Sequence, residues 1–307
     1  MRNFEVLFDD AEPSICDDPA YARYGKLAFP PSPSDRPWIY SNFVQSLDGI
    51  ASFRGRHATG GDISQLPEDR WLMGFLRAHA DAILLGINTL MEETQLLGNR
   101  GPVYSIEDAA IRKLRGKLGL GREKNIFVTG AAYLDLHDYR VFESDSVESF
   151  IITTSAGARR LADKESHGRV NVIVAGEESL VDLAQAMRIL QQNHGVNQLL
   201  CEGGPTLYGY MSRAGLIDEK FLTIAPLEIG MYVPPEQEPS DAERSDPPKE
   251  RPTTFMAPGF VKENAPWWQW LSSRRIADYQ FNRYRRRLPT ATVQGYTRKR
   301  PEYVPRH

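Results

Sequence analysis

Short apolar runs alternate with helix-like segments between residues 125 and 207, and this alternation constrains the fold more than any other feature. The runs cover residues 125–129, 150–153, 170–174 and 196–201. Before the last run we expect a helix that Ser179 caps and Gly195 stops. Strands that alternate with helices are typical of a parallel sheet with helical crossovers. The sequence therefore predicts an α/β protein.

The last apolar run leads into Glu202, two glycines and a helix that begins with Pro205. Proline is favoured there because the N–H group it lacks would have no partner inside the helix. Glycine lets a ligand approach the backbone closely, and the first N–H groups of a helix attract anions. Glu202 ends its strand where open α/β sheets bind ligands. The stretch indicates an anion site, with a plain tight connection as the alternative.

A second candidate site lies nearer the N-terminus, at the turn signal Asp48–Gly49. Residues 38–44 are β-rich and lead into this turn, and residues 51–53 are expected to return as a strand. Asp48 is a candidate catalytic carboxylate. The alternative is that it stabilises its own turn, which is the commoner role of an acid before glycine.

A helix and a buried strand follow this turn. The helix is expected to start near Pro67, with Ser64 as its cap. The wholly apolar run 82–85 predicts a central strand that is covered on both faces. Gly86 and Thr89 at its carboxyl end are suited to a nucleotide phosphate or ribose, although neither common nucleotide-binding motif is present in the sequence.

Hydroxyl groups and arginines cluster after the run 150–153. Thr154 and Ser155 lie at an expected helix start, and Arg159 and Arg160 follow within it. Such a group suits a phosphate monoester such as the 2′-phosphate of NADP. The alternative is an ordinary helix cap with arginines that face solvent. The basic stretch 101–123 is expected to be a surface helix with a solvated face.

Changes in composition mark the domain boundaries. Residues 1–36 are acidic and interrupted by prolines, so we expect an N-terminal extension. The main domain spans 37–288 and contains a Pro- and acid-rich loop at about 231–262, which we expect to be mobile. The basic residues 289–307 form a tail.

Two long runs near the C-terminus, 217–224 and 279–286, are expected to be antiparallel strands at one edge of the sheet. Trp267, Trp268 and Trp270 lie between them. Three tryptophans so close together favour a core, a subunit interface or a clamp for the loop, with stacking on a heterocycle as the alternative.

Composition excludes several classes of function. The 307 residues carry a net charge of −3, so no basic field favours nucleic acid or a membrane surface. The two cysteines, Cys16 and Cys201, argue against a disulfide framework and favour a reducing, cytoplasmic setting. We recognise no signal peptide and no run long enough to span a bilayer.

Taken together, the motifs stand in a recognisable order. They are Ser-Leu-Asp-Gly at 46–49, Leu-Arg-Ala at 76–78, the run 81–89, Glu-Gly-Gly-Pro-Thr-Leu at 202–207, Leu-Ile-Asp-Glu at 216–219 and Phe-Asn-Arg-Tyr-Arg at 281–285. This series resembles the riboflavin-biosynthesis reductase family, the reductase half of RibD-type bifunctional proteins, over about residues 37–288. The resemblance implies a dihydrofolate-reductase-like three-layer fold. Its mixed, mostly parallel sheet would carry helices on both faces and antiparallel C-terminal edge strands.

The resemblance also implies NADPH as the cofactor. The residues implied to face it are Gly86, Thr89 and Glu93, the pyrophosphate cradle Gly203, Gly204, Pro205, Thr206 and Leu207, and, at the adenosine end, Thr129, Gly130, Thr153, Ser155 and Arg159. A Gly-Gly turn before a helix suits a pyrophosphate on physical grounds as well.

The implied substrate is a ribosylaminopyrimidinone 5′-phosphate, whose sugar is reduced to a ribityl chain by direct hydride transfer. Arg77 and Arg100 match arginines that bind the substrate phosphate, and Leu97 lines the same loop. Glu202 is implied to face the substrate and to stabilise a cationic imine. Asp48 is the second catalytic candidate, for proton handling.

The chain also departs from the family pattern. Glu93 begins a Glu-Thr-Gln sequence where Asp-Asp-Pro is usual, and Ile50 replaces Lys or Arg. The zinc motif of the deaminase half is absent, so no metal site is predicted. A dihydrofolate or pterin reductase and a non-catalytic nucleotide-binding protein remain alternatives. Relatives of this kind are commonly dimers, so we expect a homodimer.

Overall fold

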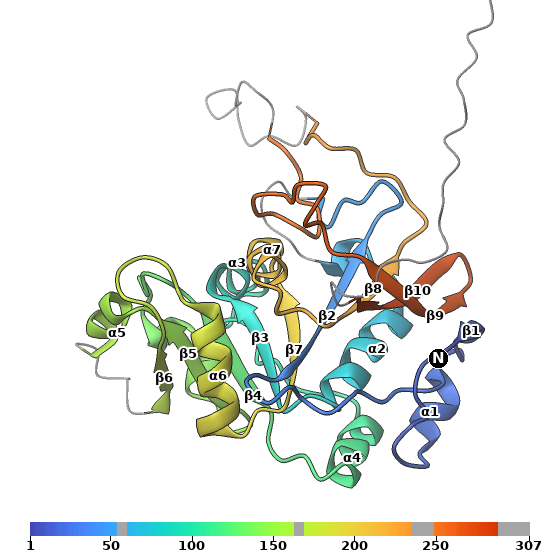
Figure 1. Cartoon of the computed structure of the whole chain (residues 1–307), viewed down its shortest axis with the longest axis horizontal. Coiled ribbons are helices and arrows are strands. Elements are labelled where there is room, and N and C mark those ends of the chain that lie inside the picture. Colours follow the sequence, from blue (N-terminus) through green and yellow to red (C-terminus); the bar gives the residue numbers. More distant parts are fainter. Residues whose placement is uncertain (54–59, 163–168, 235–248, 288–307) are drawn as a thin grey trace, which may run out of the picture.

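The computed structural model describes residues 1–53, 60–162, 169–234 and 249–287, which form one sheet between two layers of helices (Figure 1). The strands lie in the order β1-β9-β10-β8-β2-β7-β3-β4-β5-β6. Their bounds are β1 Glu5–Asp9, β2 Trp38–Gln45, β3 Ala82–Gly86, β4 Lys124–Val128, β5 Glu148–Thr153, β6 Asn171–Val174, β7 Gln198–Gly203, β8 Glu219–Ile224, β9 Trp268–Ile276 and β10 Tyr279–Arg286.

Helices connect most of these strands. They are α1 Pro19–Tyr24, α2 Pro67–Arg77, α3 Ile87–Leu97, α4 Ala109–Lys117, α5 Ser155–Ala162, α6 Leu183–His194 and α7 Pro205–Arg213, with short 3₁₀ turns at Gly60–Asp62, Leu136–Asp138 and Arg140–Phe142. Within the described ranges, no helix combines the length and the apolar character that a bilayer-spanning segment needs.

Seven neighbouring strands, from β8 to β6, run parallel, as the alternation of strands and helices predicts. The expectation that residues 217–224 form an antiparallel strand holds on one side only, because β8 is antiparallel to β10 but parallel to β2. Helix α7 carries the chain back along the sheet, so β8 starts at the same edge as β7. Among the described strands, the antiparallel pairs are β1 with β9, β9 with β10 and β10 with β8.

The two faces of the sheet have separate cores. Helices α6 and α7 cover one face, where they pack on residues such as Leu199 and Cys201. Helices α2, α3 and α4 cover the other face, and α2 contributes the apolar stripe that its sequence predicts, with Phe75 and Leu76 fully buried. Because side chains alternate along a strand, Glu202 lies on the α2 and α3 side of β7.

Two helix caps differ from the expectation. Leu66 occupies the N-cap of α2 and makes no side-chain cap bond, so Ser64 does not cap this helix. Helix α6 is capped by Asp182, whose carboxylate accepts the Gln185 N–H at 2.9 Å, instead of by Ser179. Asp182 satisfies an N–H group of the first turn directly, which makes the later start favourable.

The segment after the Asp48–Gly49 turn is not a strand. The Ser46 N–H bonds to the Ile50 carbonyl at 2.9 Å, which closes the turn, and Ile50 then forms an isolated bridge to Thr253. The partner of this segment is therefore a distant loop, and the expectation of a returning strand at 51–53 is wrong. Arg115 of α4 also differs from the expected solvated face, because it is buried and donates to the Arg77 and Ala80 carbonyls.

Residues 1–36 are joined closely to the sheet. Strand β1 pairs with β9, and the N-terminal segment lies at the same end of the sheet as the C-terminal hairpin (Figure 1). Phe4, Tyr21 and Tyr24 of this segment are buried in the α2-side core. Asp9 pairs with Arg274 of β9 at 2.6 Å, and the Arg274 side chain is fully buried.

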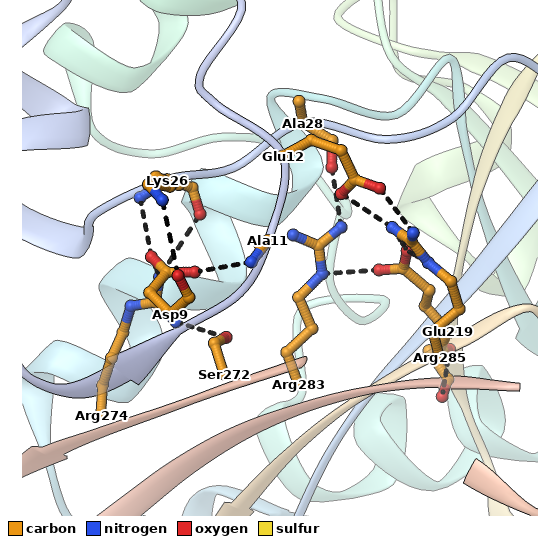
Figure 2. Close-up of polar contacts among 11 residues, drawn as sticks. Asp9, Ala11, Glu12, Lys26, Ala28, Glu219, Ser272, Arg274, Arg283 and Arg285 are labelled. Carbon is orange, nitrogen blue, oxygen red and sulfur yellow. Dashed lines mark hydrogen bonds and ion pairs between the residues drawn. The ribbon is translucent and has the colours of Figure 1, made fainter. Parts of the chain in front are cut away.

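A second set of ion pairs fixes the same segment to β8 and β10 (Figure 2). Glu219 of β8 binds Arg283 at 2.6 Å and Arg285 at 2.7 Å, and the side chains of Glu219 and Arg283 are fully buried. Arg285 also binds Glu12, and Arg283 donates to the Ala28 carbonyl at 2.7 Å. The arginines of the Phe-Asn-Arg-Tyr-Arg motif therefore serve as structural links between the sheet and the N-terminal segment.

Candidate functional site

The turn between β7 and α7 is tight and favours glycine at both positions. Gly203 has a φ of +108°, and a Cβ atom there would lie 3.2 Å from the Phe43 ring. A Cβ on Gly204 would lie 3.1 Å from Oγ1 of Thr89, which accepts the Gly204 N–H at 3.0 Å. The Gly203–Gly204 peptide bond is cis. Helix α7 begins at Pro205, so the predicted sequence of strand, Gly-Gly turn and helix is confirmed.

The carboxyl end of β3 meets this turn. A Cβ on Gly86 would lie 3.8 Å from Cβ of Leu207 and 3.9 Å from the Gly203 carbonyl oxygen. Leu207 is buried against the sheet, whereas Thr206 is exposed at the first turn of α7. The structure thus brings together Gly86, Thr89 and the whole 203–207 stretch, which the sequence had placed at the cofactor.

Arg77 and Glu202 form a buried, two-pronged ion pair. Nε and Nη2 of Arg77 donate to the two Glu202 carboxylate oxygens at 2.7 and 2.6 Å. The side chains are 8% and 7% exposed. Arg77 also donates to the Ser105 carbonyl at 3.1 Å. The resemblance assigned these residues separate contacts with substrate, but here the Arg77 guanidinium is directed at Glu202 and fixes its carboxylate.

A second acid, Glu93 of α3, lies next to this pair. The Tyr104 hydroxyl donates to Oε2 of Glu93 at 2.7 Å, and the Arg77 guanidinium lies 5.8 Å from the centre of the Tyr104 ring. Burial raises the pKa of Glu93, although the Tyr104 hydroxyl opposes this by stabilising the carboxylate. The sequence reading missed Tyr104, and its only signal was an aromatic residue within a polar, basic stretch.

Asp48 is occupied by contacts within the protein. Its carboxylate accepts the Gly230 N–H at 2.7 Å, the Ile229 N–H at 3.2 Å and the Ser46 hydroxyl. Burial opposes ionisation, but these donors outweigh it and lower the pKa of Asp48. Asp48 therefore joins its own turn to the 225–230 segment, and no described contact links it to Glu202.

Arg100 and Leu97, which are predicted to lie around the substrate phosphate, make no described contact with Arg77. Arg100 donates to the His137 carbonyl at 2.6 Å and pairs with Glu143 at 2.8 Å, and both charged side chains are partly exposed. Leu97 is exposed at the end of α3. Among the described contacts, none joins Arg100 to the Arg77–Glu202 pair.

The residues predicted to bind the adenosine end of the cofactor lie in a group of neighbouring turns. Oγ1 of Thr129 accepts the Ala132 N–H at 3.1 Å, and the Thr153 hydroxyl donates to the Gly130 carbonyl at 3.2 Å. Ser155 begins α5, and its hydroxyl lies 3.4 Å from the Gly176 carbonyl. These hydroxyls chiefly close the turns. Arg159 is exposed on α5.

The family to which the chain belongs follows from its match to a family model. The model of the RibD C-terminal domain matches residues 37–247, which is well over half of the chain. The chain belongs to the RibD C-terminal domain family. The family predicted from the ordered motifs is thus confirmed.

Two curated relatives of this RibD C-terminal domain protein come from archaea. Each carries the name 2,5-diamino-6-ribosylamino-4(3H)-pyrimidinone 5′-phosphate reductase. The protein from Methanothermobacter thermautotrophicus is 30% identical over 196 residues, which are 64% of this chain and 80% of the relative. The protein from Archaeoglobus fulgidus is 29% identical over 202 residues, which are 64% of this chain and 83% of the relative.

Solved structures share the fold of this RibD C-terminal domain protein. A pyrimidine reductase-like protein from Corynebacterium diphtheriae matches with a TM-score of 0.58 and 23% identity, over 83% of this chain and 93% of that one. Acinetobacter baumannii RibD matches with a TM-score of 0.57 and 18% identity over 83% of this chain. The match spans only 59% of that longer RibD chain. The predicted α/β fold with a mostly parallel sheet is confirmed.

Proposed function

We propose that this protein is an NADPH-dependent reductase that converts a ribosylaminopyrimidinone 5′-phosphate into its ribitylamino form. The observation that carries the proposal is the glycine turn between β7 and α7 together with the buried Arg77–Glu202 ion pair, in which Glu202 directly precedes Gly203. The cradle suits a pyrophosphate, and the acid beside it suits a sugar. The names of the archaeal relatives support the same substrate class.

The residues of the cradle fit NADPH. Gly203 and Gly204 lie closely against Phe43 and Thr89, so the turn is tight and α7 starts directly at the carboxyl end of β7. The first turn of α7 adds N–H groups and the positive end of the helix dipole. Pro205, Thr206 and Leu207 are assigned to the pyrophosphate with the two glycines, and Gly86, Thr89 and Glu93 also face the cofactor. Thr129, Gly130, Thr153, Ser155 and Arg159 are assigned to the adenosine end.

The protein's own contribution to the reaction is positioning and charge. When bound, the cofactor supplies a hydride. Glu202 is held rigidly by Arg77, so its carboxylate offers fixed acceptor positions to a sugar hydroxyl or a cationic imine. Arg77 is buried against Glu202, whereas Arg100 is 44% exposed although it pairs with Glu143, so we assign the substrate phosphate to Arg100. Leu97 is also exposed, at the end of α3. Asp48 then supports its loop and takes no direct part in the reaction.

The test is turnover in a defined assay. Oxidation of NADPH should require the ribosylaminopyrimidinone 5′-phosphate, and dihydrofolate should give none. Turnover of dihydrofolate alone would support a folate- or pterin-type reductase instead. Tight NADPH binding without oxidation of NADPH by either compound would support a nucleotide-binding protein without catalytic activity.

We further propose that the protein is a cytoplasmic homodimer. Both cysteines, Cys16 and Cys201, are free thiols, which suits a reducing compartment. Trp267 and Trp270 at the C-terminal hairpin are well exposed, as are Val6 and Leu7 of the adjoining strand β1. An exposed apolar group of this kind suits a subunit interface. Sedimentation equilibrium should give twice the chain mass, and a monomer at micromolar concentration would refute this part.

A further inference from the structure

Tyr104 stands between the two acids of the candidate site. It lies in the segment between α3 and α4, and only 5% of its surface is exposed. Its hydroxyl binds Glu93 at 2.7 Å, and its ring faces the Arg77 guanidinium, which in turn binds Glu202. The four side chains therefore form a continuous series, from Glu202 through Arg77 and Tyr104 to Glu93, built from four separate parts of the chain.

A buried amide fixes Tyr104 in this place. Asn125 of β4 is fully buried, accepts the Tyr104 N–H at 3.1 Å and donates to the Tyr104 carbonyl at 2.9 Å. The Tyr104 ring also packs on Phe127, with ring centres 5.9 Å apart. A polar residue in the middle of an apolar strand is costly unless its hydrogen bonds are made. Here both are used to hold the Tyr104 backbone.

Glu93 lies on the side of α3 that faces the glycine cradle. Thr89 is one turn earlier on the same helix face, and its hydroxyl oxygen binds the Gly204 N–H. The charged and titratable groups around Glu93 are Tyr104, Arg77, Glu202 and Glu92. Burial and the two neighbouring glutamates favour the protonated carboxyl, whereas Tyr104 and Arg77 favour the carboxylate.

We propose that Tyr104 is a positioning residue that holds Oε2 of Glu93 and so makes Glu93 an effective proton donor for the reduction. This inference rests on the proposed function. As the hydride of the nicotinamide cofactor bonds to C1′ of the open-chain imine, the C=N electron pair moves to nitrogen. The nitrogen takes the proton of the Glu93 carboxyl, and the O–H bond breaks to leave a carboxylate. The Tyr104 hydroxyl donates to this carboxylate and stabilises it.

The direction of the effect follows from this hydrogen bond. Removing the Tyr104 hydroxyl takes a donor away from the Glu93 carboxylate, so the pKa of Glu93 should rise and Glu93 should become a weaker acid. A hydrogen bond to a charged group, if lost, lowers kcat by about 10- to 100-fold. Because Glu93 must be protonated to act, activity falls as pH rises through its pKa. This alkaline limb of the kcat profile should therefore move to higher pH when the Tyr104 hydroxyl is removed.

The variant that tests this is Tyr104→Phe, compared with Tyr40→Phe. Tyr40 is also fully buried, and its hydroxyl donates at 2.9 Å to the Leu76 carbonyl, away from Glu93. We expect Tyr104→Phe to lower kcat by a larger factor than it raises the Kd for NADPH, and to shift the alkaline limb of the kcat profile to higher pH. Tyr40→Phe should leave the limb in place, and Glu93→Gln should abolish it.

The outcomes separate this proposal from the proposed function. If the wild-type protein turns over substrate and the limb of Tyr104→Phe coincides with that of Tyr40→Phe, the positioning role is refuted. If the wild-type protein turns over no substrate, the proposed function fails. The pKa of Glu93 is then measured by NMR on carboxyl-labelled glutamate, where an upward shift in Tyr104→Phe supports the hydrogen-bond control of Glu93 and an unchanged value refutes it.

Discussion

Replacing Glu202 by alanine leaves Arg77 charged and buried without its partner, and we expect a large loss of stability. The pair is less than one tenth exposed on both sides and is joined by two short hydrogen bonds. The contacts that remain to Arg77, from Ser105 and the Met73 sulfur, are neutral. Removing one partner of such a pair costs about 3 to 5 kcal/mol. That is a large share of a typical unfolding free energy of about 5 to 15 kcal/mol.

The assay is guanidinium denaturation at neutral pH, with Glu107→Ala as the matched control. Glu107 pairs with Arg70 at 2.7 Å, but these side chains are 71% and 70% exposed. An exposed pair contributes about 0 to 1 kcal/mol. The double variant Arg77→Met with Glu202→Leu removes both charges and should regain most of the stability. If Glu202→Ala loses no more stability than Glu107→Ala, the pair does not hold the site together as described.

Three further predictions concern the N-terminal segment and the adenosine end. Burial lowers the pKa of His79 to about 4, and the Tyr21 hydroxyl lies 2.8 Å from its ring nitrogen. The unfolded chain therefore binds this proton first, and stability should fall by about 3 kcal/mol as pH drops from about 6.5 to 4. Denaturation of His79→Gln should lack this loss. A Cβ on Gly157 would lie 2.0 Å from the Thr153 hydroxyl oxygen, so Gly157→Ala should cost about 1 to 3 kcal/mol by the same method and weaken NADPH binding. Arg159→Ala should remove a preference for NADPH over NADH in thermal-shift measurements, and an unchanged preference would exclude Arg159 from the 2′-phosphate site.

Local patterns in the sequence predicted the elements that build the cradle. The apolar run before Gly86 became β3, the stripe of Phe75 and Leu76 became the buried face of α2, and the proline after two glycines became the start of α7. Each of these elements depends on residues close together in the sequence, so hydrophobic periodicity and turn-forming residues were sufficient to predict it.

Contacts between distant residues were not predictable in this way. Arg77 and Glu202 are 125 positions apart, and each alone suits a ligand as well as it suits a partner. The basic sequence around Arg115 predicts a solvated charge. The backbone carbonyls that Arg115 binds belong instead to Arg77 at the end of α2 and to Ala80 in the segment after α2. Asp9 and Arg274 are 265 positions apart, so the docking of residues 1–36 on the sheet depends on topology that composition does not reveal.

The most direct test of the account is the fate of the hydride. The protein is incubated with the ribosylaminopyrimidinone 5′-phosphate and NADPH that carries deuterium at either face of the nicotinamide C4, and the product is analysed by mass spectrometry. We predict that one of the two labelled cofactors transfers a single deuterium to C1′ of the ribityl chain. A product that carries no deuterium with either cofactor would contradict direct hydride transfer in this site.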